Sequence, residues 1–137
     1  MAKKRILVVE DMPESLMILR IRLEAHNYEV ISATDGEEGL NKARELRPDL
    51  ILLDVMLPKM DGYTVCRLLK FDEEYEDIPI IMLTARGQEK DMAIGKNVGA
   101  DMYFVKPYDH AKLVAAIEKL TSEIHVSPGM KKIIRPN

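Results

Sequence analysis

Residues 50–54 read Leu50-Ile51-Leu52-Leu53-Asp54, four apolar side chains that run directly into a carboxylate. A continuous apolar run of this length indicates a strand that is buried on both faces of a parallel sheet. Three further runs have the same form, each followed by a polar residue: Ile6–Val9 before Glu10, Ile80–Leu83 before Thr84, and Met102–Val105 before Lys106. Tyr28–Ala33 alternates more and suits a strand nearer an edge of the sheet.

Helical patterns separate these runs. Within Pro13–Ala25, three leucines recur at spacings of three and four residues, and Pro13 is acceptable in a first turn. Further helices are predicted over Gly36–Leu46 with Asp35 as the N-cap, over Tyr63–Phe71, over Gln88–Asn97, and after Asp109. Five strands that alternate with helices predict an α/β fold with a parallel sheet, helices on both faces and right-handed crossovers.

The composition limits the possible classes of protein. A chain of 137 residues suits one domain, and its net charge of −3 gives no reason to expect nucleic acid or an anionic membrane as the main partner. One cysteine excludes a disulfide framework and a Cys-rich zinc site. The apolar run behind the basic N-terminus stops at Glu10, which is too short for a signal peptide, and no run approaches the roughly 20 residues of a membrane span. We therefore expect a cytoplasmic protein.

The composition changes after Val126. Ser127-Pro128-Gly129 breaks the helical pattern, and the residues that follow include Lys131, Lys132 and Arg135. We expect one domain over residues 1–126 and, over residues 127–137, either a flexible basic tail or the start of a linker.

The polar residues at the strand ends carry the chemistry. The carboxyl ends of parallel strands meet along one edge, where open α/β sheets place their ligands. Three carboxylates, a hydroxyl and an ammonium would converge there: Glu10, Asp11, Asp54, Thr84 and Lys106. Crowded carboxylates repel unless one is protonated or a cation lies among them, and hard oxygen ligands suit Mg²⁺. A carboxylate can also be the nucleophile that forms an acyl phosphate, with the metal and the lysine neutralising the phosphoryl oxygens.

These residues resemble the receiver domain of two-component response regulators. The resemblance covers about residues 4–124, with its motifs in order and at the spacing of the family. It implies a flavodoxin-like fold of five βα units with strand order 2-1-3-4-5. The matching stretches are Ile6–Asp11, Pro48–Asp54, Leu57–Gly62, Pro79–Ala85, Gly99–Asp101 and Lys106-Pro107.

The resemblance implies a phosphorylation and metal site. Asp54 would be the phosphoacceptor. Glu10 and Asp11 would hold Mg²⁺, or alternatively Mn²⁺, together with Asp54 and the backbone carbonyl of Met56. Glu10 stands where the family more often has aspartate, and its longer arm favours ligation through water.

The resemblance also assigns the residues that respond to phosphorylation. Lys106 would pair with the phosphoryl group, and the Thr84 hydroxyl would move to bond it. Tyr103 takes the position of the aromatic that exchanges between exposed and buried rotamers, although it could simply be a half-buried aromatic of an edge strand. The Lys106–Pro107 peptide bond is cis in receivers of this type.

In receivers, the second residue after the phosphoacceptor and the second after the threonine lie over the phosphoryl group, so the resemblance implies that Met56 and Arg86 bear on its lifetime. Met56 is apolar and cannot orient an attacking water, whereas Arg86 is long enough to cover the phosphoryl oxygens. Ala85 leaves room for the phosphoryl group. We expect an acyl phosphate that lasts many minutes.

The favoured function is therefore a switch that takes a phosphoryl group from a histidine kinase or a histidine phosphotransfer protein. It would be no enzyme beyond its own phosphorylation and dephosphorylation. The resemblance implies that its output partner binds the face formed by the fourth helix, fifth strand and fifth helix. On this face Ala116 stands near the position where the family often has an arginine, so we expect a monomer or, on phosphorylation, a weak homodimer. The alternative is a receiver-like interaction module that works without phosphorylation. A Mg²⁺-dependent phosphatase is disfavoured, because it requires an aspartate where Met56 stands.

Overall fold

A computed structural model of the chain describes residues 3–85 and 97–122. Most of the helix predicted over Gln88–Asn97 lies outside these residues, as do Arg86 and residues 123–137. In chain order the elements are β1 (Arg5–Val9), α1 (Pro13–Ala25), β2 (Glu29–Ala33), α2 (Gly36–Leu46), β3 (Leu50–Asp54), α3 (Gly62–Lys70), β4 (Ile80–Thr84), β5 (Met102–Val105) and α5 (His110–Ser122). Every predicted strand is present, and α1 and α2 have the predicted bounds.

The five strands form one parallel sheet in the order β2-β1-β3-β4-β5. This order and the flavodoxin-like fold confirm the prediction, and β2 lies at an edge as its alternating pattern suggested. β1 pairs with β2 on one side and with β3 on the other, so that Val8 lies opposite both Ser32 and Leu52. The order of the strands reverses at β1 and β3, the place where such sheets bind ligands.

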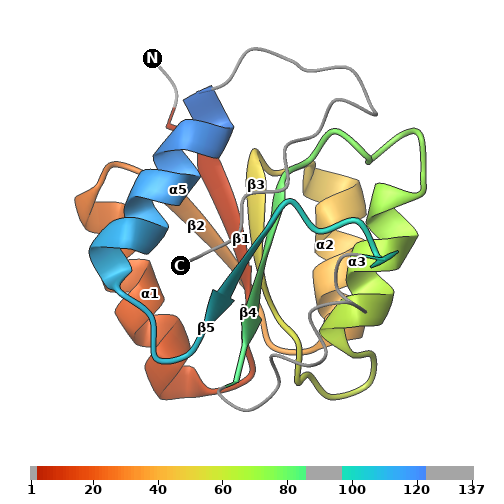
Figure 1. Cartoon of the computed structure of the whole chain (residues 1–137), viewed down its shortest axis with the longest axis horizontal. Coiled ribbons are helices and arrows are strands. Elements are labelled where there is room, and N and C mark those ends of the chain that lie inside the picture. Colours follow the sequence, from red (N-terminus) through yellow and green to blue (C-terminus); the bar gives the residue numbers. More distant parts are fainter. Residues whose placement is uncertain (1–2, 86–96, 123–137) are drawn as a thin grey trace.

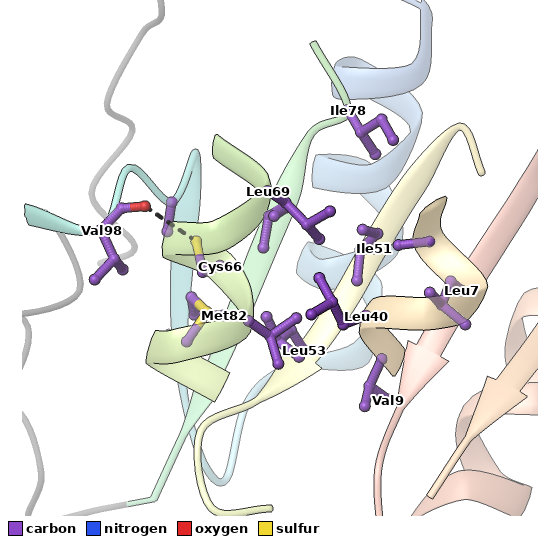
Figure 2. Close-up of a cluster of buried hydrophobic side chains, with 14 of the residues drawn as sticks. Leu7, Val9, Leu40, Ile51, Leu53, Cys66, Leu69, Ile78, Met82 and Val98 are labelled. Atoms are coloured by element: carbon purple, nitrogen blue, oxygen red, sulfur yellow. Dashed lines mark hydrogen bonds between the residues drawn. The ribbon is translucent and has the colours of Figure 1, made fainter. Parts of the chain in front are cut away.

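Helices cover both faces of the sheet, α1 and α5 on one and α2 and α3 on the other (Figure 1). Successive residues of β1 point to opposite faces, so Leu7 and Val9 join one core while Ile6 and Val8 join the other. Figure 2 shows the first core, in which side chains from α2 and α3 meet those of β1 and β3. Both faces of the central strands are therefore dry, which explains their unbroken apolar runs.

The helix starts follow the predicted capping chemistry. Asp35 Oδ1 accepts a hydrogen bond from the Glu38 amide at 2.7 Å at the start of α2. Asp109 Oδ1 accepts from the Ala111 amide at 2.8 Å at the start of α5. Leu46, the last residue of α2, is 37% exposed. It occupies the last turn of the helix, just before Arg47 takes a left-handed conformation and the chain turns away.

A buried ion pair joins α3 to the start of β5. Lys70 Nζ lies 2.9 Å from Asp101 Oδ2 and also donates to the carbonyl oxygens of Glu76 at 2.8 Å and Ile78 at 2.9 Å. Asp101 Oδ2 accepts a second hydrogen bond from the Ile80 amide at 2.8 Å. All three protons of the ammonium therefore have acceptors, and the pair fastens the loop between α3 and β4. Both contacts of Asp101 thus lie inside the protomer.

We predict that Lys70→Met destabilises the chain by about 3–5 kcal/mol, because it leaves the buried Asp101 carboxylate without its counter-charge. Urea unfolding followed by circular dichroism measures the change. Lys119→Met, at an exposed position of α5, is the matched control and should stay within about 0.5 kcal/mol of the parent. Equal stabilities of the two variants would contradict a structural role for the pair.

Candidate functional site

The predicted polar residues come together at the carboxyl edge of the sheet. Glu10 and Asp11 follow β1, Asp54 ends β3 and Thr84 ends β4, while Lys106 follows β5. Carboxylate oxygens of Glu10, Asp11 and Asp54 lie within 4.8 Å of one another. Glu10 and Asp54 are almost completely buried, at 1% and 5% exposure, whereas Asp11 is partly exposed.

Lys106 binds both buried carboxylates. Its Nζ lies 2.6 Å from Asp54 Oδ2 and 3.4 Å from Glu10 Oε1. The other oxygen of each carboxylate accepts from a backbone amide two residues further along the chain. Asp54 Oδ1 accepts from Met56 at 3.0 Å, and Glu10 Oε2 accepts from Met12 at 3.1 Å. Each carboxylate is thus oriented from two sides, and these amides are contacts that the sequence could not reveal.

The site shifts the pKa values of its charged groups. Burial raises the pKa of Glu10, and the neighbouring Asp54 charge adds to this, while the Met12 amide and Lys106 act in the opposite direction. Burial lowers the pKa of Lys106, but the hydrogen bond and charge of Asp54, with a smaller contribution from Glu10, outweigh it, so the net pKa is raised. Lys106 therefore remains a cation at neutral pH.

Backbone geometry holds the acidic edge in place. Gly62, the first residue of α3, donates its amide to the Val55 carbonyl at 2.9 Å. A Cβ at Gly62 would collide with the Asp54 carbonyl oxygen, so glycine lets α3 begin directly against the end of β3. The Lys106–Pro107 peptide bond is cis, and the Lys106 amide donates to the Thr84 carbonyl at 2.7 Å.

Two buried hydroxyls lack a hydrogen-bond partner within residues 3–85 and 97–122, those of Thr84 and Tyr103. Thr84 is 0% exposed and Tyr103 is 1% exposed, so Tyr103 is fully buried rather than a half-buried edge aromatic. Burial strongly raises the pKa of the Tyr103 phenol, with smaller contributions from Cys66 and Tyr63. An unsatisfied buried hydroxyl costs about 1–3 kcal/mol, so both side chains occupy positions that are unfavourable for a polar group.

The remaining sequence-predicted residues are placed as follows. Ala85, directly after β4, is exposed, and Met56 is 61% exposed beside Asp54. Tyr108 was not predicted from sequence, yet it packs edge-on against Phe104 with ring centroids 6.1 Å apart. The sequence feature that could have drawn attention to Tyr108 is its position directly after Lys106-Pro107.

The donor set fits a hard divalent cation. Three carboxylates against one ammonium leave an excess of negative charge when all are ionised. Oxygen ligands with room for water suit Mg²⁺ better than a soft metal.

Comparison with known proteins identifies the family. A family model described as the response regulator receiver domain matches residues 6–118. The chain belongs to this family. It is therefore a receiver domain of the two-component type, in agreement with the resemblance of its motifs.

The receiver is similar to parts of longer regulators. It is 47% identical over 116 residues to the DNA-binding dual master transcriptional regulator RpaA of Synechocystis, with 85% of this chain and 48% of that protein covered. It is 44% identical over 117 residues to the alkaline phosphatase synthesis transcriptional regulatory protein PhoP of Bacillus subtilis, again with 85% and 48% covered. The chain thus spans about half the length of the curated relatives that it matches.

Among solved structures, the receiver resembles the receiver domain of the sensor histidine kinase PA1611 from Pseudomonas aeruginosa. The TM-score is 0.82 at 31% identity, with 89% of this chain and all of the other covered. That structure is described as having a magnesium ion coordinated in its active site cleft.

In the described part of the present chain, no helix is long and apolar enough to cross a membrane.

Proposed function

We propose that Asp54 accepts a phosphoryl group from a phosphohistidine of a kinase or phosphotransfer protein. The observation that carries this proposal is the Asp54 carboxylate itself, which lies 2.6 Å from the Lys106 ammonium and within 4.8 Å of two further carboxylates. A carboxylate oxygen of Asp54 attacks phosphorus, the phosphorus–nitrogen bond breaks, and the histidine keeps the electron pair of that bond. Lys106, already paired with Asp54, is placed to bind an oxygen of the arriving phosphoryl group.

Glu10, Asp11, Asp54 and the Met56 carbonyl would hold Mg²⁺, with Mn²⁺ as the alternative. The acidic cluster and the magnesium in the related kinase receiver support this assignment. The ion would supply positive charge for the phosphoryl oxygens. Burial of Glu10 strengthens the case, since a buried carboxylate beside two others gains from a cation that offsets their repulsion.

The response would pass through Thr84 and Tyr103. Within the described residues the Thr84 hydroxyl has no hydrogen-bond partner, and it would gain one by bonding a phosphoryl oxygen. The Tyr103 hydroxyl would gain water by turning outward. Both changes relieve an unfavourable burial, so the phosphorylated arrangement satisfies two groups that the unphosphorylated one does not.

The phosphodonor would cover the exposed apolar face of α1. Asp54 lies at the carboxyl edge of the sheet, where α1 begins, so a donor that reaches Asp54 would contact this edge. Met17, Ile18 and Ile21 lie on the outer side of α1 at 62%, 48% and 60% exposure. Met12, 55% exposed, continues this apolar surface toward the acidic cluster.

The chain would act as the regulatory half of a larger regulator or as a separate switch, and would catalyse no reaction besides its own phosphorylation and dephosphorylation. We place the receiver within residues 1–126, in the cytoplasm, with residues 127–137 as a tail or linker. The names of the relatives support an output on DNA, but nucleic acid would be bound by their other half. The output partner would bind the face formed by the helix predicted over Gln88–Asn97, by β5 and by α5. The assembly would be a monomer or a weak homodimer.

Phosphorylation at Asp54 is tested by incubation with acetyl phosphate and Mg²⁺. Intact mass should show one added phosphoryl group on the parent and none on Asp54→Ala, because the nucleophile is gone. Asp77→Ala, an exposed acid in the loop before β4, is the control and should be labelled like the parent. Labelling of Asp54→Ala to the parent level would refute the assignment.

Asp11→Asn tests the metal assignment. The variant should bind Mg²⁺ at least tenfold more weakly by calorimetry, since it loses a charged ligand. Its metal-free form should be more stable than the parent in urea unfolding, by about 1 kcal/mol or less, because one repulsive charge is removed. Unchanged Mg²⁺ affinity would show that Asp11 is not a ligand of the metal.

Ile18→Glu tests the donor surface. Transfer from a phosphorylated histidine donor should slow at least tenfold, because a charge replaces an apolar contact, while labelling by acetyl phosphate should be unchanged. Ala115→Glu, at an exposed position of α5, is the control. If donor transfer to Ile18→Glu matches that to the control, the donor does not bind this face.

The lifetime of the acyl phosphate is tested with Met56→Asn combined with Arg86→Ala. An amide can orient an attacking water, and loss of the guanidinium uncovers the phosphoryl oxygens, so phosphate should be lost at least several-fold faster. Intact mass over time follows the loss. Decay as slow as in the parent would show that these residues do not protect the acyl phosphate.

A further inference from the structure

β2 is an edge strand, and its outer side is occupied by side chains from two helices. Among the described strands, β2 has a single neighbour, β1. Such an edge presents backbone amides and carbonyls to any strand that can align with it.

The residues of β2 that face outward can be identified from the hydrogen bonds to its neighbour. Glu29 donates its amide to the Lys4 carbonyl, and the Ala33 carbonyl accepts from Glu10, so the odd-numbered residues face β1. Because backbone groups alternate in direction along a strand, Val30, Ser32 and then Thr34 direct theirs to the open side.

Three charged side chains bind these outward groups, and we call them the edge clamp: Arg20, Glu38 and Lys42. From α1, Arg20 donates to the Val30 carbonyl at 3.4 Å and to Ser32 Oγ at 3.2 Å. From α2, Lys42 donates to the Ser32 carbonyl at 2.6 Å, and Glu38 accepts the Thr34 amide at 2.8 Å. The two helices lie on opposite faces of the sheet, so the clamp reaches β2 from both sides (Figure 1).

We propose that the edge clamp closes β2 against pairing with the β2 strand of a second copy of this chain. Two identical edges can pair antiparallel about a twofold axis, which makes self-pairing the simplest strand addition available. A second strand would have to displace Lys42 from Ser32 and would bring the four clamp cations of the two copies together. Ion pairs of Arg20 with Glu24 at 3.6 Å and of Lys42 with Glu38 at 3.2 Å hold the two cations near their positions.

The clamp also limits where partners can bind by strand addition. Since β2 is closed, a segment that extends the sheet of this receiver must use the β5 side. The clamp would therefore protect the monomeric form of the chain.

The test is the oligomeric state of Arg20→Ala combined with Lys42→Ala. Analytical ultracentrifugation should show self-association at least tenfold tighter than for the control, Arg22→Ala with Arg44→Ala. The control removes one cation from each of the same helices at exposed positions, so its net charge is identical. Equal sedimentation of the two proteins would overturn the proposal.

A third substitution separates edge pairing from a general loss of solubility. Ser32→Pro on the clamp variant removes an outward amide and should return sedimentation to that of the control. Persistent association of a folded triple variant would overturn the proposal. If circular dichroism shows that the triple variant is unfolded, the deciding measurement is amide hydrogen exchange of the Arg20→Ala, Lys42→Ala double variant. Exchange at Val30 and Ser32 should slow at least several-fold as its concentration rises, and exchange independent of concentration would refute edge pairing.

Discussion

All strands of the sheet run in the same direction, and the chemistry of this receiver depends on that constraint. Lys106 Nζ and Glu10 Oε1 are 3.4 Å apart although 96 residues separate them in the chain. Parallel strands bring their carboxyl ends to one edge, so residues that are distant in sequence become neighbours without any long loop. The pairing register of the strands then fixes which side chains meet.

The charged groups at the two ends of the sheet are balanced differently. At the amino end of β5, the Lys70 ammonium and the Asp101 carboxylate balance each other, and every proton of Lys70 has an acceptor. At the carboxyl end, three acids face one lysine, and burial raises the pKa of Glu10. The first arrangement secures the fold, whereas the second holds charge that only a cation or a phosphoryl group with its cation would balance.

The unpartnered hydroxyls follow the same division. Among the residues that the structure describes, the buried Thr84 and Tyr103 hydroxyls have no hydrogen-bond partner, while both carboxylate oxygens of Glu10 and of Asp54 are engaged. The groups that could gain a hydrogen bond if the site changed are therefore distinct from the carboxylates, whose contacts are already made. The edge clamp at β2 lies on the opposite edge of the sheet from β5, away from these groups.

Sequence alone determined the strand positions, the parallel fold and the identities of the charged residues at the strand ends. It could do so because a strand buried on both faces must be apolar throughout, as in Leu50–Leu53, and must end where a polar residue such as Asp54 appears. Only the tertiary structure decided which atoms meet. The Met12 and Met56 amides on the carboxylates, the full burial of Tyr103, the inward use of Asp101 and the clamp of Arg20 and Lys42 on β2 all depend on side-chain reach between separate elements. Such contacts leave no periodic pattern in the sequence, because each depends on the distance between two packed elements and not on the spacing of residues along one of them.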